Sequence, residues 1–306
     1  MIILSLFDGI SAGRVALERA GVAVDEYYSS EIDKYCIQIS QKNYPDIRQL
    51  GDVKNWREWD IEKPDLIIGG SPCQGFSFAG KQLAFNDKRS VLFFEYINIL
   101  KHYKPKYFLL ENVPMKKEFL EIISNEIGVK PILINSSLVS AQQRKRYYWT
   151  NIQNINQPDD KQIYLKDVIE NGFVDREKSY CIDASYYKGT NLSIYFNKSR
   201  RQAVFNKPIR IGDFGKKCQS QRIYSANGKS VALSALGGGG GAKTGLYEID
   251  SVIRKLTPIE CERLQTLPDN YTEGVSNTQR YKMLGNSWTV DVIAHILKFI
   301  NINKGN

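Results

Sequence analysis

Residues 65–77 read Asp65-Leu66-Ile67-Ile68-Gly69-Gly70-Ser71-Pro72-Cys73-Gln74-Gly75-Phe76-Ser77, a short apolar run followed by a turn rich in glycine and proline. The apolar run predicts a buried strand, and the turn places the Cys73 thiol just beyond its end. A second apolar run, Tyr107–Leu110, ends in Glu111. In an open α/β sheet, ligands bind in the crevice at the carboxyl ends of the strands. A thiol and a carboxyl group that meet in this crevice predict a reaction centre.

Around this stretch, the first half of the chain alternates strand and helix signals, which favours an α/β fold with a parallel, doubly wound sheet. The predicted strands are Ile2–Leu6, Asp25–Ser30, Asp65–Gly69, Tyr107–Leu110, Ile132–Val139 and Tyr147–Trp149, and the predicted helices are Arg14–Ala20, Asp33–Asn43 and Ser90–His102.

Helical signals return after Lys255. Thr257-Pro258-Ile259-Glu260 predicts an N-cap, a first-turn proline and a capping box that open a helix through Leu264. Thr289–Ile300 carries apolar residues at helical spacing. We expect both segments to pack against the first half of the chain.

The stretch between these halves has a different composition, with short β-like runs and a glycine tract, Gly237–Gly241. We therefore predict a first lobe at 1–165, a smaller β-rich lobe at 166–252 and a returning segment at 253–306. The window 166–250 holds 14 Lys and Arg against 8 Asp and Glu, which is +6 of the formal charge of +9. This asymmetry indicates a lobe that grips a polyanion. A flexible basic insertion is the alternative interpretation.

The cysteines and the apolar runs limit the classes of protein to which the chain can belong. The five cysteines are widely spaced and form no Cys-x-x-Cys pair: Cys36, Cys73, Cys181, Cys218 and Cys261. This pattern favours a reducing compartment and argues against a disulfide framework and a zinc site. The start, Met1–Phe7, lacks the basic region of a signal peptide, and no apolar run approaches the roughly 20 residues that cross a membrane. We expect a cytoplasmic protein without a bound metal or a membrane partner.

Two further acidic residues suit a nucleotide-like ligand. A strand, the turn Phe7-Asp8-Gly9 and a helix form an arrangement that binds such ligands near the helix N-terminus. Glu31 follows the second predicted strand, where an acidic residue can accept hydrogen bonds from two ribose hydroxyls. Asp52, in Gly51-Asp52-Val53, offers an acceptor for an adenine amine.

The reaction centre needs groups that act on Cys73. A thiol attacks as the thiolate, so nearby positive charge would help, and Arg144 and Arg146 supply it from one face of a predicted strand. Glu111 is interpreted as a proton donor or hydrogen-bonding group. Each group has an alternative interpretation: Cys73 could be an inert buried thiol, the basic run 142–146 a solvated strand edge, and Glu111 a carboxylate in a buried ion pair.

Taken in order, the motifs resemble those of the C5-cytosine DNA methyltransferases. They are Phe7-Asp8-Gly9, Glu31, Gly51-Asp52-Val53, Gly70-Ser71-Pro72-Cys73-Gln74, Glu111-Asn112-Val113, Gln142-x-Arg144-x-Arg146 and Gly285-Asn286-Ser287. The resemblance covers essentially the whole chain. The catalytic lobe is similar to that of animal de novo enzymes, and the variable lobe, with Gln219–Tyr224 and Leu233–Gly239, is similar to bacterial enzymes of the GCGC-modifying type.

The resemblance implies a Rossmann-like methyltransferase fold with a target-recognition domain at 166–252, and S-adenosylmethionine as the methyl donor. The cofactor residues it implies are Phe7, Asp8, Gly9, Ser11, Glu31, Ile32, Asp52, Val53, Pro72, Leu92, Asn286 and Ser287. Ser11 stands where the family commonly has glycine.

The resemblance also implies the chemistry. The cytosine would be flipped out of the duplex, Cys73 would add to C6, Glu111 would bond N3 and Arg146 would bond O2. Arg144 and Gln142 complete this catalytic set. C5 would then take the methyl group, leaving S-adenosylhomocysteine.

Double-stranded DNA is the implied partner, with a GCGC-like core as the expected target. The DNA-contacting residues are predicted to be Ser77, Gln219, Arg222, Ser234, Leu236, Gly237, Gly238 and Gly239, with Arg222 reading a guanine. Ala232-Leu233 stands where a threonine usually begins the pair that grips a phosphate. We expect a monomer of prokaryotic or phage origin, and a cognate restriction endonuclease is a partner that the resemblance leaves open.

Three other interpretations compete with a DNA methyltransferase. One branch of the same scaffold modifies tRNA, although a lobe with Arg222 and a glycine tract suits a major groove, which A-form RNA hides from side chains. A non-catalytic DNA-binding paralogue would be expected to lose Cys73, Glu111 or Asn286. A nicotinamide-dependent enzyme would need a full Gly-x-Gly-x-x-Gly, which the chain lacks.

Overall fold

A computed structural model describes residues 1–71, 90–191 and 253–302, together with the short pieces 194–195, 201–206, 210–213 and 222–224. The strands are β1 (Ile2–Leu6), β2 (Glu26–Ser30), β3 (Arg48–Gln49), β4 (Leu66–Gly69), β5 (Tyr107–Asn112), β6 (Ile132–Asn135), β7 (Lys145–Thr150), β8 (Ala203–Phe205), β9 (Arg210–Asp213), β10 (Arg222–Tyr224) and β11 (Ile253–Lys255). The α-helices are α1 (Ala12–Arg19), α2 (Lys34–Asn43), α3 (Ser90–Tyr103), α4 (Lys117–Ile127), α5 (Leu165–Val168), α7 (Pro258–Leu264), α8 (Asn277–Asn286) and α9 (Val290–Ile302), and the 3₁₀ helices are η1 (Val53–Glu58), η3 (Ser136–Leu138) and η4 (Tyr186–Lys188).

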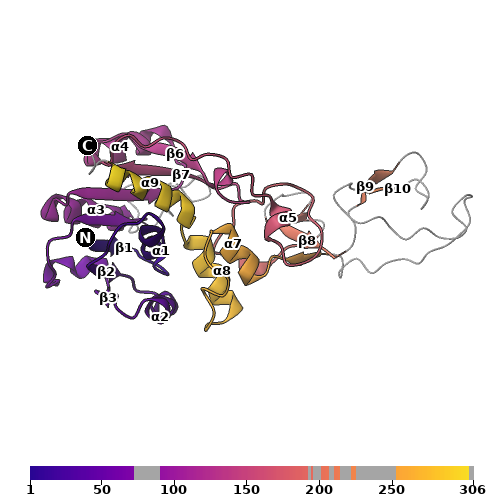
Figure 1. Cartoon of the computed structure of the whole chain (residues 1–306), viewed down its shortest axis with the longest axis horizontal. Helices are drawn as coiled ribbons and strands as arrows, with labels where there is room; N and C mark the ends of the chain where they lie inside the picture. Colours follow the sequence, from indigo (N-terminus) through magenta and orange to yellow (C-terminus); the bar gives the residue numbers. More distant parts are fainter. Residues whose placement is uncertain are drawn as a thin grey trace, which may run out of the picture.

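Seven strands form the central sheet, in the order β3-β2-β1-β4-β5-β7-β6 (Figure 1). The pairs from β3 to β5 are parallel, as predicted, and the order reverses direction at β1, which is the switch point of a doubly wound sheet. The predicted parallel sheet has one antiparallel strand near its edge, because β7 runs antiparallel to both β5 and β6. The mixed α/β fold itself is confirmed.

The sheet is buried on both faces, because successive apolar side chains of its strands point to opposite sides. In β4, Leu66 and Ile68 pack into one cluster with side chains of α1, α2 and α9, while Ile67 packs into a second with side chains of α3 and α4. This explains why the strands read as continuous apolar runs rather than as alternating ones. None of the helices in the described ranges is long and apolar enough to span a membrane.

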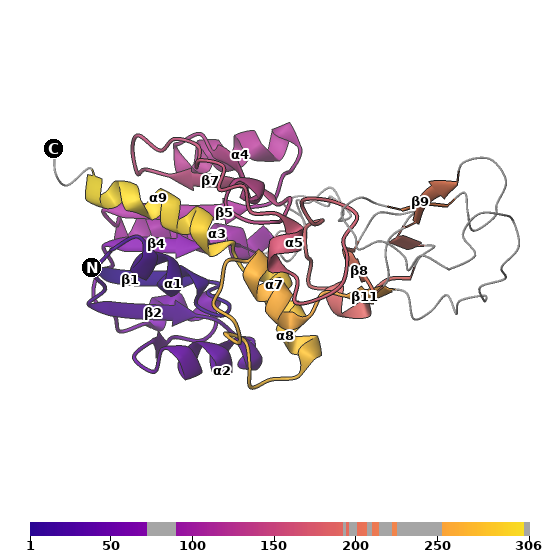
Figure 2. The same ribbon diagram turned by 45° about the vertical axis from the view of Figure 1, so that its right-hand side comes forward.

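The C-terminal segment packs back onto the first lobe, as expected. Helix α9 lies against α1 (Figures 1 and 2), and Asp291 at its start pairs with Arg19, 2.6 Å between carboxylate and guanidinium. The predicted capping box of α7 is confirmed: the Glu260 amide donates to the Thr257 hydroxyl, and the Thr257 amide donates to the Glu260 carboxylate.

Two local predictions were incomplete. The strand expected at Ile132–Val139 ends at Asn135, whose side chain accepts a hydrogen bond from the Ser137 amide and caps the 3₁₀ helix η3 instead. Helix α4, which buries Phe119 and Ile123, was not predicted.

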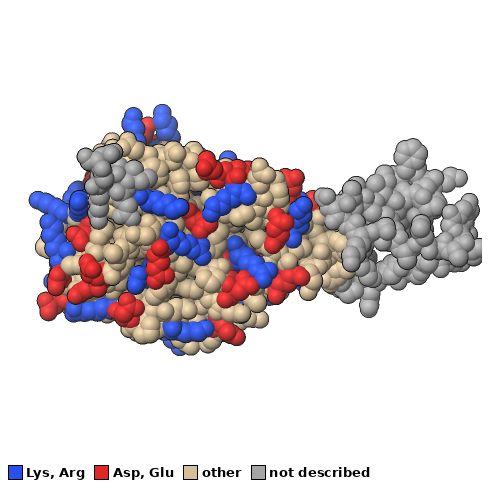
Figure 3. All heavy atoms as spheres, in the orientation of Figure 1, with Lys and Arg blue, Asp and Glu red and all other residues tan. Residues whose placement is uncertain are grey.

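Beyond the sheet, the described residues between 165 and 255 form α5, η4 and two small antiparallel pairs, β8 with β11 and β9 with β10. On the face shown in Figure 3, acidic and basic side chains of the described residues are interspersed. Much of the basic window 166–250 lies outside the described residues.

Candidate active site

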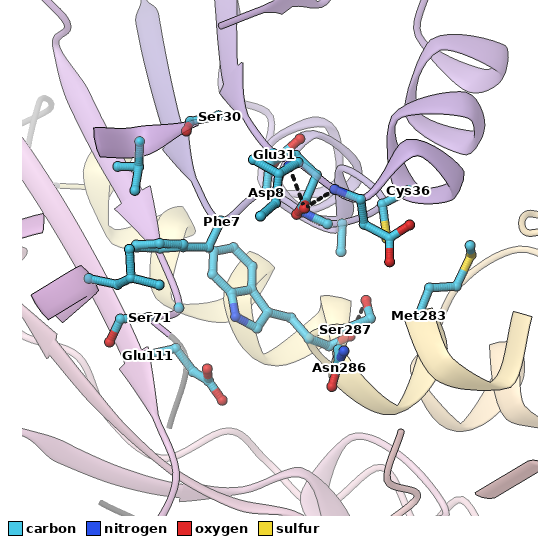
Figure 4. Close-up of a pocket in the computed structure, with 18 of the residues that line it drawn as sticks. Phe7, Asp8, Ser30, Glu31, Cys36, Ser71, Glu111, Met283, Asn286 and Ser287 are labelled. Carbon is cyan, nitrogen blue, oxygen red and sulfur yellow. Dashed lines mark hydrogen bonds between the residues drawn. The ribbon is translucent and has the colours of Figure 1, made fainter. Parts of the chain in front are cut away.

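A single cavity of about 430 Å³ lies at the carboxyl ends of β1, β2, β4 and β5, and the C-terminal segment closes its far wall. Figure 4 shows Phe7 near the centre of the view, with Asp8 and Glu31 above it, Ser71 and Glu111 at the lower left, and Asn286 and Ser287 at the lower right. The predicted site residues that line it are Phe7, Asp8, Gly9, Glu31, Ile32, Asp52, Val53, Leu92, Glu111, Arg144, Arg146, Asn286 and Ser287.

The turn after β1 is built around the Asp8 carboxylate. It accepts hydrogen bonds from four hydroxyls, those of Ser5 (2.5 Å), Ser11 (2.6 Å), Tyr27 (2.7 Å) and Ser29 (2.9 Å). Burial, followed by the nearby Asp8 charge, raises the pKa of Tyr27 well above its ordinary value, so its hydroxyl remains a donor. Asp8 therefore fixes the shape of the turn as well as contributing to the cavity wall.

Ser11 does not line the cavity but sits beneath it, with a left-handed backbone at φ 59°. Such a conformation favours glycine, the residue common in the family at this position. The serine hydroxyl lies 2.6 Å from both the Asp8 carboxylate and the Ser40 hydroxyl. These two hydrogen bonds offset part of the backbone strain of a non-glycine residue at this position.

Glu31 at the end of β2 is held by three backbone amides, those of Gly9 (2.8 Å), Ile32 (2.7 Å) and Asp33 (2.8 Å). Ile32 beside it is 71% exposed, which is unusual for a large apolar side chain that lines a cavity. A fixed carboxylate next to an uncovered apolar surface can hold a sugar diol and the flat face of a base.

The walls on either side of Glu31 come from distant parts of the chain. Asp52 caps η1 by accepting from the Lys54 amide (3.0 Å). Across the cavity, Lys282 of α8 forms an ion pair with Asp33, 2.7 Å between Nζ and the carboxylate. Burial opposes ionisation of Asp33, but the hydrogen bond and charge of Lys282, together with the hydrogen bonds from the Tyr35 and Cys36 amides, outweigh it and lower the Asp33 pKa from its ordinary value.

The opposite end of the cavity holds a carboxylate–guanidinium pair. Glu111, 9% exposed at the end of β5, lies 2.8 Å from Arg146 Nε on the neighbouring strand β7. A Cβ on Gly70 would lie 3.0 Å from both Glu111 Oε2 and Trp288 Nε1. Glycine at this position therefore lets the backbone that leads to Cys73 pass close to the acidic group.

The Gln142-x-Arg144-x-Arg146 motif divides into two roles. Arg144 precedes β7, which begins at Lys145. Its guanidinium borders the cavity but donates to main-chain carbonyls, those of Ile182 (3.2 Å), Gly285 (3.3 Å) and Ser287 (2.8 Å). Gln142 is fully buried and does not line the cavity. Of the three, Arg146 is the one that meets Glu111.

Several predicted residues lie outside the part of the chain that the structure describes: Cys73, Pro72, Ser77, Gln219, Ser234, Leu236, Gly237, Gly238, Gly239 and the Ala232-Leu233 pair. Arg222 lies in β10, opposite Asp213 of β9, with only its backbone described.

Sequence reasoning missed Cys36, Lys282 and Met283 as lining residues, and it gave no role to three others that stand in or beside the quoted motifs: Ser71, Asn112 and Trp288. Lys282 and Met283 precede Asn286 by four and three residues, so helical spacing could have found them. Cys36 lines the cavity as a neutral thiol, because burial and the nearby Glu31 and Asp33 charges raise its pKa. Among the described residues, no cluster of three or more His, Cys, Asp or Glu side chains is arranged to hold a metal ion.

Comparisons with known proteins agree with this geometry. The family described as C-5 cytosine-specific DNA methylase matches residues 1–301. Type II methyltransferase M.HhaI of Haemophilus parahaemolyticus is 34% identical over 99% of this chain and 94% of its own length. Type II methyltransferase M1.ScrFI of Lactococcus lactis subsp. cremoris is 33% identical over 95% of this chain and 75% of its own length. The solved structure of the Entamoeba histolytica methyltransferase EhMeth shares the fold, with a TM-score of 0.69 at 17% identity over 99% of this chain and 98% of that one. The chain belongs to the C-5 cytosine-specific DNA methylase family and is a DNA (cytosine-5)-methyltransferase.

Proposed function

We propose that the chain methylates C5 of a cytosine flipped out of a short, specific duplex site, with S-adenosylmethionine as donor and Cys73 as nucleophile. The observation that carries the proposal is that one cavity joins the Glu31 end, suited to a nucleoside, to the Glu111–Arg146 pair. The names of the two relatives as type II methyltransferases support a role in restriction-modification.

The cavity suits the proposed cofactor in size and in chemistry. Its volume of about 430 Å³ lies within the range of small-molecule sites. Glu31 presents an anchored carboxylate for the ribose hydroxyls, Asp52 an acceptor for the adenine amine, and Ile32 an uncovered apolar surface. Phe7, Val53, Leu92, Asn286 and Ser287 complete the walls. When bound, S-adenosylmethionine supplies an activated methyl group and leaves as S-adenosylhomocysteine; the proposal includes no metal.

The protein residues act on the pyrimidine ring. The Cys73 thiolate adds to C6, and the electron pair of the C5–C6 bond moves into the ring. Glu111 takes up a proton and donates it in a hydrogen bond to N3, while Arg146 donates a hydrogen bond to O2, so the two groups stabilise the negative charge that develops on the ring. C5 takes the methyl group, a base removes the C5 proton, and the C6–sulfur bond breaks to release Cys73.

Arg144 and Gln142 enter this proposal as positioning residues. The Gln142 amide donates to the Leu264 carbonyl (3.2 Å) and accepts from the Ile182 amide (2.9 Å). Together with the bonds that the Arg144 guanidinium donates to the Gly285 and Ser287 carbonyls, this anchors β7 to the C-terminal segment and aligns Arg146.

We also propose the lobe boundaries 1–165, 166–252 and 253–306, with DNA contacts from Ser77, Gln219, Arg222, Ser234, Leu236 and 237–239. Helix α5 contacts α7, and the Glu170 amide donates to the Glu260 carboxylate (2.7 Å), which supports a chain that leaves and re-enters the first lobe at neighbouring points. We infer a monomer that acts in the prokaryotic cytoplasm, consistent with its bacterial relatives. A GCGC-like target and a restriction partner remain part of the proposal.

Transfer of a radiolabelled methyl group from S-adenosylmethionine to plasmid DNA tests the function. We expect transfer by the wild type and by Cys261→Ala, whose thiol is buried in α7 away from the cavity, and none by Cys73→Ala. A duplex carrying 5-fluorocytosine should become covalently attached to Cys73. Full turnover by Cys73→Ala would refute the nucleophile, and methylation of tRNA in place of plasmid would refute the DNA substrate. Bisulfite sequencing of the plasmid gives the target site.

A further inference from the structure

Gln265, the residue that follows α7, is a fully buried glutamine whose side-chain amide makes four hydrogen bonds. Its Nε2 donates to the carbonyls of Leu284 (2.7 Å) and Ser287 (3.3 Å). Its Oε1 accepts from the Thr289 hydroxyl (3.0 Å) and from Gln142 Nε2 (3.3 Å). Two donors and two acceptor sites are all that a carboxamide has, so this side chain is completely used.

These contacts cap helix α8 from a distance. The last carbonyls of an α-helix have no partner within the helix and must be satisfied by other groups. At the end of α8, the Ser287 amide bonds the Met283 carbonyl (2.8 Å), Gln265 bonds the Leu284 carbonyl, and Arg144 bonds the Gly285 carbonyl (3.3 Å). The Arg144 charge also suits the negative end of the helix dipole.

Gln265 also holds the far end of the turn that links α8 to α9. Its backbone carbonyl accepts from the Val290 amide (2.9 Å) at the start of α9. The chain from 284 to 290 is therefore tied to one residue at four points: the carbonyls of Leu284 and Ser287, the Thr289 hydroxyl and the Val290 amide.

The opposite side of the same turn forms a wall of the cavity. Asn286, Ser287 and Trp288 line it, whereas Gln265 does not. Groups fixed before a ligand arrives lose less conformational entropy on binding, so a turn tied at four points favours affinity.

We propose that Gln265 is a positioning residue of the cofactor site, which sets the turn 285–288 in its binding conformation without touching the ligand. This inference rests on the proposed function, because it takes the cavity to be the S-adenosylmethionine site. Substitution of Gln265 weakens cofactor binding but does not change the affinity for DNA.

The test compares Gln265→Met with Gln202→Met by titration calorimetry. Gln202 is a matched control, because it is also buried and bonds Tyr195 (2.9 Å) and the Ala203 carbonyl (2.9 Å) in the second lobe. We expect the Kd for S-adenosylmethionine to rise at least about tenfold in Gln265→Met, equivalent to about 1.4 kcal/mol, and less than about twofold in Gln202→Met. KM for the cofactor should rise with it, while the Kd for duplex DNA stays the same.

Should Gln265→Met fail to fold, Thr289→Val removes one of the four ties and keeps the side-chain shape. It should raise the cofactor Kd about threefold, the effect of roughly 0.7 kcal/mol. If Gln265→Met folds and its cofactor Kd equals that of the wild type, the positioning role is overturned. If Gln265→Met does not fold, an unchanged cofactor Kd in Thr289→Val overturns it. An equal rise in Gln202→Met also overturns it. If the wild type binds no S-adenosylmethionine, the proposed function fails and the positioning role falls with it.

Discussion

Gly285 marks the place where α8 crosses the backbone of residues 183–184, and it should not tolerate a methyl group. A Cβ built at this position would lie 2.1 Å from the Asp183 carbonyl carbon and 2.3 Å from the Ala184 nitrogen. Real Cβ atoms essentially never approach another heavy atom within 3.0 Å, and both obstacles are backbone. Gly285→Ala therefore forces the helix and the 183–184 segment apart.

The size of the effect follows from three contributions. Overpacking of this kind costs about 1–3 kcal/mol, at the upper end where backbone must move. A shift of α8 also weakens the bonds from Arg144 to the Gly285 carbonyl, a loss of about 1.5 kcal/mol for a charged donor. Alanine in a helix gains about 1 kcal/mol over glycine. We expect a net destabilisation of about 3 kcal/mol.

Urea unfolding followed by circular dichroism measures this change, with Gly13→Ala as the control. A Cβ on Gly13 would also be too close, 2.6 Å from Ile68 Cδ1, but that atom is the end of a flexible side chain that can turn away. Gly13→Ala should therefore lose less than about 1 kcal/mol, since rotamer adjustment is cheap and alanine favours the helix. A Gly285→Ala protein as stable as the wild type would refute the crossing geometry.

Two further predictions concern the cofactor pocket. Ser11→Ala keeps the left-handed backbone but loses the hydroxyl bonds to Asp8 and Ser40, and should cost about 2 kcal/mol of stability. Ser11→Gly loses the same bonds without the strain and should cost about 1 kcal/mol less; equal urea midpoints for the two variants would contradict this. Ile32→Ala, at a side chain 71% exposed, should change stability by less than about 0.5 kcal/mol. Its Kd for S-adenosylmethionine should nevertheless rise about fivefold by calorimetry, from the loss of buried apolar surface, and an unchanged Kd would show that the cofactor does not cover Ile32.

The elements that local chemistry specifies could be predicted from the sequence. Strand β1 has the predicted bounds, Ile2–Leu6, because a continuous apolar run suits a strand buried on both faces. The capping box at Thr257 was predicted because it depends on four consecutive residues. Glu31 and Glu111 were predicted as site residues because each follows an apolar or β-like run, Asp52 was predicted from its motif, and all three line the cavity.

What depends on distant partners could not be predicted in this way. Period-two alternation placed Arg144 and Arg146 together, but Arg144 precedes the strand and bonds carbonyls 141 and 143 residues further along the chain. No local pattern indicates that the end of α8 needs side chains from another part of the chain as its caps. The antiparallel direction of β7 was not predicted for a similar reason, because an apolar run does not indicate in which direction its strand crosses the sheet.

The packing of α9 on α1 bears on when the enzyme becomes competent during synthesis. The ribosome releases Cys73, Glu111 and Arg146 long before it makes residues 290–302, yet the core beside the first helix is completed only by that late helix. A chain that ends before residue 286 therefore contains the groups that we propose to react without the wall formed by Asn286 and Ser287, and one that ends before residue 290 lacks α9. Translation itself would delay methylation until nearly the whole polypeptide has emerged, and nonsense mutations upstream of codon 290 should behave as complete losses rather than as partial enzymes.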